Sequence, residues 1–160
     1  MEARSMFGIG VRNKQPAGVK LEVYAGTVEQ MLTNLGVDPA QARMNTQEGY
    51  GWSFRRGSAV IEIYITQQGG VGYLQVLSPI MHLPPQGLLP LYRHLLELNL
   101  KLTNAAMGVY LDVVYIFNER PVDGLDAVET NAIINQVAQY ADELDDKLVS
   151  EFGGRLYARI

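Results

Sequence analysis

Residues 88–102 read LLPLYRHLLELNLKL and hold eight leucines among fifteen residues. At about 100° per residue, Leu89, Leu96 and Leu100 form a row beside a first apolar row that contains Leu88, Leu91, Tyr92, Leu95, Leu98, Asn99 and Leu102. The two rows together span about 200° of the predicted helix, whereas a helix lying on one sheet needs little more than 100°. The second row therefore needs another surface, either the long helix predicted later in the same chain or another subunit.

The residues before this helix indicate a helix and then a three-stranded meander. Thr27-Val28-Glu29-Gln30 fits a capping box, and helical apolar spacing leads from it to Gly36, which suits the left-handed end of a helix. Asp38-Pro39 can cap one further turn. From residue 47 the apolar period changes to two, which predicts strands at residues 47–56, 59–66 and 71–80 separated by glycine turns.

The residues after it predict a hairpin and a second, longer helix. Two apolar segments, 105–111 and 113–119, meet around Asp112, and a second capping box at Asp126-Ala127-Val128-Glu129 opens a helix that Gly153-Gly154 ends. The order α-β-β-β-α-β-β-α predicts a single α+β domain with a largely antiparallel five-stranded sheet. We expect this domain at residues 27–154, with an N-terminal extension at 1–26 and a C-terminal tail at 155–160.

Composition places the chain among ordinary globular proteins. It has 160 residues, 48% hydrophobic and 19% charged, and contains no cysteine, which excludes disulfides, thiolate metal sites and cysteine nucleophiles. Its N-terminus lacks the apolar core of a secretory signal, and its longest apolar run, residues 113–117, is far short of the ~20 residues of a membrane helix. We therefore expect a soluble cytoplasmic protein that contacts no membrane.

Several segments resemble one known family. They are LLELNLKL at 95–102, Met107-Gly108 in the following strand, RPVDGLD at 120–126 and, above all, ADELDDKL at 141–148. These segments resemble the YbjN-like proteins, which are similar in fold to type III secretion chaperones. The resemblance covers about residues 27–154 and implies a small dimeric protein-binding fold with no catalytic residues to carry over.

Candidate catalytic and metal-binding residues are few. The chain has two histidines, His82 and His94, and neither lies in a metal-binding or triad signature. Asp142, Glu143, Asp145 and Asp146 are acidic, but a straight helix cannot wrap an ion, so a solvated acidic face is expected. We predict a protein that is not an enzyme and that needs no metal or cofactor.

A nucleic-acid adaptor is a disfavoured possibility. Tyr50, Trp52 and Phe54 alternate along one strand and could stack on bases, although core packing is the more common use of this pattern. The net charge of −4 also argues against binding nucleic acid. The basic residues of such an adaptor would be Arg4, Arg12, Lys14, Arg55 and Arg56.

The leading interpretation is a non-enzymatic, chaperone-like or regulatory adaptor module that binds a segment of another protein. Its candidate dimer or partner contact is the row of Leu89, Leu96 and Leu100, and a homodimer is favoured because a two-fold interface buries two copies of the row. The alternative is a small-molecule-binding or weakly enzymatic domain. Its aromatic-lined pocket would use Tyr50, Trp52, Tyr64 and Tyr73.

Overall fold

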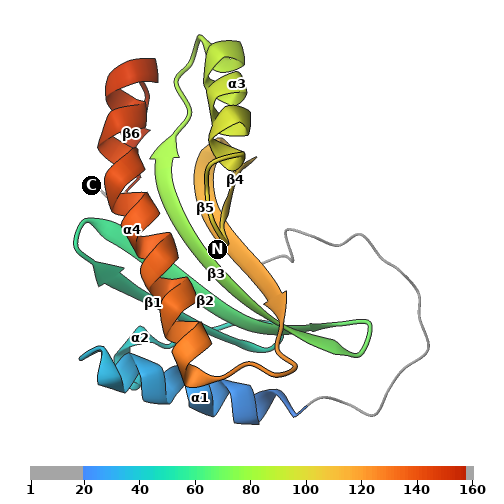
Figure 1. The fold of residues 1–160 in the computed structure, drawn as a ribbon. Helices are drawn as coiled ribbons and strands as arrows, with labels where there is room; N and C mark the ends of the chain where they lie inside the picture. Colours follow the sequence, from blue (N-terminus) through green and yellow to red (C-terminus); the bar gives the residue numbers. More distant parts are fainter. Residues whose placement is uncertain (1–19, 158–160) are drawn as a thin grey trace. The chain divides into compact units, whose positions relative to one another are not determined.

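The structure is a computed structural model that describes residues 20–157. In chain order its elements are α1 (Leu21–Asn34), α2 (Pro39–Ala42), β1 (Tyr50–Arg56), β2 (Ala59–Gln68), β3 (Val71–His82), α3 (Leu88–Asn99), β4 (Ala106–Tyr110), β5 (Val113–Pro121), α4 (Ala127–Phe152) and β6 (Arg155–Leu156) (Figure 1). The predicted α+β class is confirmed. Among residues 20–157, no helix combines the length and the apolar character needed to cross a membrane.

The sheet has six strands in the order β1-β2-β3-β5-β4, with β6 paired to β3. The β4–β5 hairpin is antiparallel, with Ala106 opposite Phe117 and Tyr110 opposite Val113. The predicted count of five strands was wrong by one, because β6 is only two residues long and shows no alternation in the sequence.

The described residues fall into two compact units. The first comprises residues 20–54, 62–75 and 119–132, and the second comprises residues 55–61, 76–118 and 133–157. Each unit contains a part of β2, β3, β5 and α4. The candidate leucine row lies in the second unit.

In the first unit, α1 begins at Leu21, six residues before the predicted start at Thr27. The predicted capping box was wrong: Thr27 lies inside the helix, where its hydroxyl donates to the Val23 carbonyl oxygen at 3.3 Å. The predicted end was right, since Gly36 is left-handed with φ of 78°. Asp38 caps α2 as predicted, accepting from the backbone N–H of Ala40 at 2.9 Å.

The start of α4 also belongs to the first unit. Asp126 accepts from the backbone N–H of Glu129 at 2.8 Å, which confirms half of the second capping box. The reciprocal bond is replaced, because the Glu129 carboxylate pairs with Arg120. Residues 1–19, which include most of the predicted extension, lie outside the described residues.

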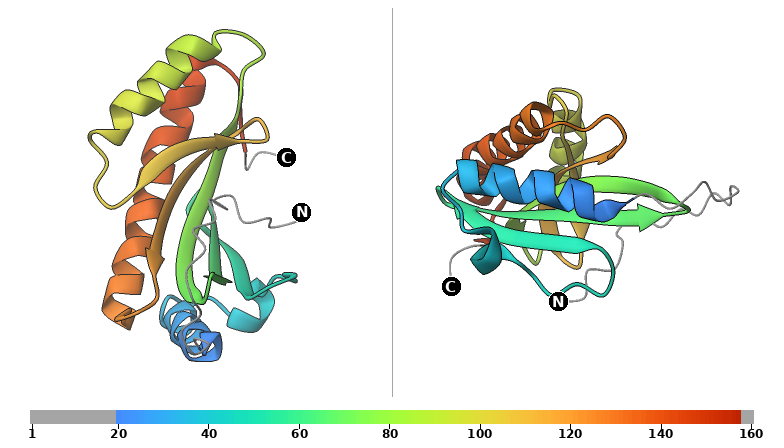
Figure 2. Two further views of the ribbon diagram at one scale, coloured as in Figure 1. Left: turned by 90° about the vertical axis from the view of Figure 1, so that its right-hand side faces the viewer. Right: turned by 90° about the horizontal axis from the view of Figure 1, so that it is seen from below.

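In the second unit, α3 packs on β4 and lies alongside the C-terminal half of α4 (Figure 2). The rings of His94 and Phe152 are 5.1 Å apart and join the two helices. Below them, the hydroxyl oxygen of Tyr140 in α4 accepts from the backbone N–H of Thr103 at 3.0 Å. These contacts fix one side of α3 and determine which of its leucines face outward.

Candidate partner-binding surface

The two leucine rows of α3 have opposite environments. Leu91 and Leu95 are 0% and 4% exposed, whereas Leu89, Leu96 and Leu100 are 80%, 69% and 89% exposed. The interpretation in which the second row packs on the long helix of its own chain was therefore wrong. The chain folds with three large apolar side chains of one helix in solvent.

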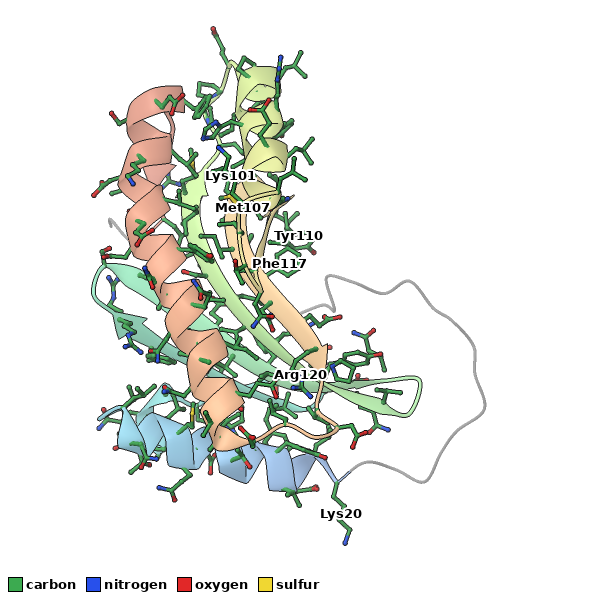
Figure 3. All side chains as sticks on the ribbon, viewed as in Figure 1. Lys20, Lys101, Met107, Tyr110, Phe117 and Arg120 are labelled. Atoms are coloured by element: carbon green, nitrogen blue, oxygen red, sulfur yellow. The ribbon has the colours of Figure 1, made fainter. Side chains whose placement is uncertain are left out.

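The orientation of α3 is set by its C-terminal end. The side chain of Asn99 accepts from the backbone N–H of Met107 at 2.7 Å and donates to the Met107 carbonyl oxygen at 3.2 Å. This pair of bonds ties the helix to β4, and Figure 3 shows Met107 and Lys101 next to the point where α3 ends. With Leu95 buried and Asn99 bound, the 100° step per residue turns Leu96 and Leu100 away from the chain.

Charged residues border the exposed row. Arg93 donates to the Glu97 carboxylate at 2.9 Å, one turn apart on the polar side of the helix. The guanidinium of Arg93 holds the pKa of Glu97 below its ordinary value, first through this hydrogen bond and then through its charge. An apolar strip with a charged rim is the usual anatomy of a protein interface.

The β4–β5 hairpin adds apolar residues that the sequence analysis did not select. Leu111 is 74% exposed in the turn and has φ of 45°, a region that large side chains seldom adopt. The ring of Phe117 lies over Gly108, where an added Cβ would be 3.4 Å from it, and Figure 3 shows Phe117 and Tyr110 on the same side of the hairpin. A leucine inside a tight turn was the sequence signal for this feature.

The four aromatic residues of the alternative ligand pocket do not face one space. Tyr50 and Trp52 stack with centroids 6.3 Å apart, and the guanidinium of Arg43 lies 4.6 Å and 5.0 Å from their rings. Arg43 is held by Glu29 of α1 at 2.8 Å. Trp52 itself is fully buried, as expected for a core residue of β1.

Tyr64 lies on the opposite face of the sheet. An added Cβ at Gly51, the residue between Tyr50 and Trp52, would be 3.2 Å from the Tyr64 ring, and neighbouring strand residues point to opposite faces. The Tyr64 hydroxyl donates to Glu62 at 2.9 Å, while burial raises the pKa of that carboxyl. Tyr73 is half-buried on β3, between the buried Gly72 and Leu74.

The acidic stretch of α4 differs from the expected solvated face. Asp142, Glu143 and Asp146 are exposed, but Asp145 is only 8% exposed, so the expectation was wrong for that residue. Ser58 lies over it, with its hydroxyl 2.8 Å from Asp142 and 3.4 Å from Asp145. Within residues 20–157, no three His, Cys, Asp or Glu side chains are grouped so that they could hold a metal ion.

Asp145 borders a pocket of about 160 Å³ in the second unit. The pocket is lined by Arg55, Ser58, Ala59, Pro79, Ile80, Ala141, Asp145, Asp146 and Leu156. Burial raises the pKa of Asp145, and the nearby charges of Asp146 and Asp142 act in the same direction, against the hydrogen bond from the Asp146 N–H. Sequence spacing alone gave no sign of this pocket, because its residues come from four separate segments of the chain.

Both histidines contact aromatic rings. His82 lies 5.3 Å from the ring of Tyr157, and burial, followed by the charge of Arg155, lowers its pKa. The ring of His94 is tilted by 44° against that of Phe152. A general base needs an orienting partner and a reactive group within hydrogen-bond reach, and contact with an aromatic ring supplies neither.

Comparisons with known proteins found similar folds among solved structures. No family model matches the chain, and no curated protein matches it. Among solved structures, the HopA1–SchA chaperone–effector complex matches with a TM-score of 0.60 and 9% identity over 82% of this chain and 99% of that chain. The ExsC–ExsE complex matches with a TM-score of 0.61 and 10% identity over 81% and 96%.

The Yersinia pestis type III secretion chaperone SycH, solved in complex with a stable fragment of YscM2, also matches. Its TM-score is 0.54 at 15% identity, over 76% of this chain and 98% of that chain. At sequence identities this low, structural similarity is evidence for a shared fold alone. The resemblance to the YbjN-like proteins stays a prediction. The chain shares the α+β fold of type III secretion chaperones.

Proposed function

We propose that this chain is a non-enzymatic, chaperone-like or adaptor module that binds a segment of another protein and that acts as a homodimer. The observation that carries the proposal is the solvent-exposed row of Leu89, Leu96 and Leu100 on a helix whose other side is fixed in the core. Moving three leucine side chains from water into an apolar contact is favourable, so we expect a second protein surface to bind this row.

The fold likeness supports the same function. Two of the matched structures are complexes of a chaperone, one with an effector and one with a fragment of another protein, and the likeness extends over three quarters or more of this chain. A module of this kind needs apolar surfaces and strand edges rather than reactive groups. The contacts of both histidines with aromatic rings and the core position of Trp52 agree with that requirement.

The homodimer and the partner are tested separately. Analytical ultracentrifugation of the purified chain at tens of micromolar tests the dimer, and a monomer at that concentration would contradict it. For the partner, the tagged chain is used to capture proteins from its own cells, and each captured protein is purified and titrated against the chain. Failure of every such candidate to bind directly would contradict the partner-binding function.

A further inference from the structure

The C-terminal residues Arg155–Tyr157 lie along an edge of β3 as a short added strand. Leu156 pairs with Met81 and Arg155 with His82, and the backbone N–H of Tyr157 donates to the Ile80 carbonyl oxygen at 3.1 Å. Nearer the middle of β3, its neighbour is β2: the Ser78 hydroxyl of β3 donates to the Val60 carbonyl oxygen of β2 at 2.7 Å. The chain's own tail thus covers the last residues of β3.

This added strand is weakly held. Only two residues form the ladder, and the entropy lost when a segment is ordered is of the same order as the gain from so few hydrogen bonds. Two left-handed glycines, Gly153 and Gly154 with φ of 81° and 87°, join it to α4. Arg155 is exposed, so the segment is anchored by two half-buried side chains, Leu156 and Tyr157, the second of which stacks on His82 at 5.3 Å.

The pocket beside Leu156 contains a carboxylate that forms no ion pair with a described residue, although Arg55 also lines this pocket. Asp145 is 92% buried by its 8% exposure, and among residues 20–157 no Lys or Arg forms an ion pair with it. The Ser58 hydroxyl has one hydrogen for two carboxylates, and Asp142 is nearer at 2.8 Å than Asp145 at 3.4 Å. Buried carboxylates are normally paired, so the pocket is suited to a basic side chain.

We propose that the β3 edge at Ile80–His82 is an acceptor site for an extended segment of a partner protein, which displaces Arg155–Leu156 and places a Lys or Arg against Asp145. Antiparallel addition in the direction of β6 would put an apolar residue where Leu156 now lies. Because alternate strand residues share a face, the residue two positions later would lie on the same face as Leu156, which lines the pocket. The partner motif is therefore an apolar residue, any residue, and a basic residue.

This inference rests on the proposed function, because it specifies how the chain would recognise a partner segment. The probes are two labelled peptides: residues 153–160 of this chain, GGRLYARI, and the same peptide with the change Ala158→Lys. Fluorescence anisotropy measures their affinity for the full-length chain. The Ala158→Lys peptide should bind about tenfold more tightly than the unchanged peptide, and Asp145→Asn in the protein should abolish that difference.

Release of the native tail gives a second test. Leu156→Gly removes the apolar anchor without adding a charge, and Tyr157→Pro removes the N–H that bonds Ile80. Each variant, checked by circular dichroism, should bind the Ala158→Lys peptide several-fold more tightly than the native chain does. In the native chain, a saturating amount of this peptide should accelerate hydrogen exchange at the Tyr157 amide.

Three results would overturn the inference: no binding of either peptide, equal binding of both peptides, or weaker binding after Leu156→Gly and Tyr157→Pro alike. None of them concerns the homodimer or capture of a full-length partner. Failure at this edge, with a directly binding partner in hand, would therefore refute the acceptor site and leave the proposed function standing. Peptide binding with no cellular partner would do the reverse.

Discussion

The change Leu96→Asp tests the role of the leucine row directly. Full burial of a leucine side chain contributes about 1.5–3 kcal/mol, and Leu96 is 69% exposed before association. Covering it in a dimer is thus worth about 1–2 kcal/mol in each subunit. Since a two-fold interface loses both copies, the apolar term alone weakens the dimer by about 2–4 kcal/mol, or roughly 30- to 1,000-fold in Kd.

The introduced carboxylate adds to this loss, because an unpaired charge buried in the interface costs several kcal/mol more. In the isolated subunit the same carboxylate stands in water next to Arg93 and costs little. Leu96→Asp should therefore give a folded monomer, seen as native circular dichroism together with halved mass in sedimentation equilibrium. Val128→Asp is the matched control, since Val128 is 80% exposed but belongs to the first unit, at the start of α4.

A Leu96→Asp chain that sediments as a dimer with unchanged Kd would refute the assignment of the row to the subunit contact. A native chain that is monomeric at tens of micromolar would refute the dimer itself. A dimer disrupted equally by Val128→Asp would show that added charge, rather than the leucine row, decides association.

Four further substitutions, one of them a control, test individual contacts within the two units. Asn99→Ala removes both bonds to the Met107 backbone and should lower the free energy of unfolding by about 1–3 kcal/mol in urea titrations. Gly49→Ala should destabilise by a similar amount, since φ is 69° and the new Cβ would be 2.1 Å from a carbonyl oxygen of β2; Gly26→Ala, with open space around it, should be neutral or stabilising by up to about 1 kcal/mol. Asp145→Asn should raise the melting temperature at pH 7, because burial raises the pKa of that carboxyl and its ionised form therefore opposes folding. That gain should shrink as the pH falls through the raised pKa of Asp145 and vanish below the ordinary carboxyl value of 3.8, where folded and unfolded chains are both protonated, and a gain that grows at low pH would contradict the reasoning.

The meander and the hairpin could be predicted because their signals are local. Alternation in Ile61, Ile63 and Ile65 with a glycine turn at either end defines β2 without tertiary information, and all three are fully buried. The start of α1 could not be predicted in this way. A threonine hydroxyl serves equally as a cap or, as at Thr27, as a donor to the preceding turn, and only the burial of Ala25 inside the fold decides between them.

The candidate sites also differ in whether their residues are close together in the sequence. The exposed leucine row could be recognised because all its residues belong to one helix, whose apolar arc is wider than one sheet can cover. The β6 strand and the pocket at Asp145 could not, because each depends on segments that are far apart in the sequence. The angular position of Asp142 and Asp146 on α4 correctly indicates solvent, while the burial of Asp145 between them arises from the turn at Ser58.

The two candidate surfaces of the second unit differ in chemistry, and this difference makes their roles separable. The α3 row offers three aliphatic side chains with a charged rim and no free backbone groups, which suits association through side-chain packing. The β3 edge offers backbone hydrogen bonds, now used by a two-residue strand, and one buried carboxylate, which suits an extended segment with a defined basic residue. A substitution that charges the row changes neither the Ile80 carbonyl nor Asp145. A monomeric Leu96→Asp chain should therefore keep its affinity for an extended basic peptide, because association and segment binding depend on different atoms.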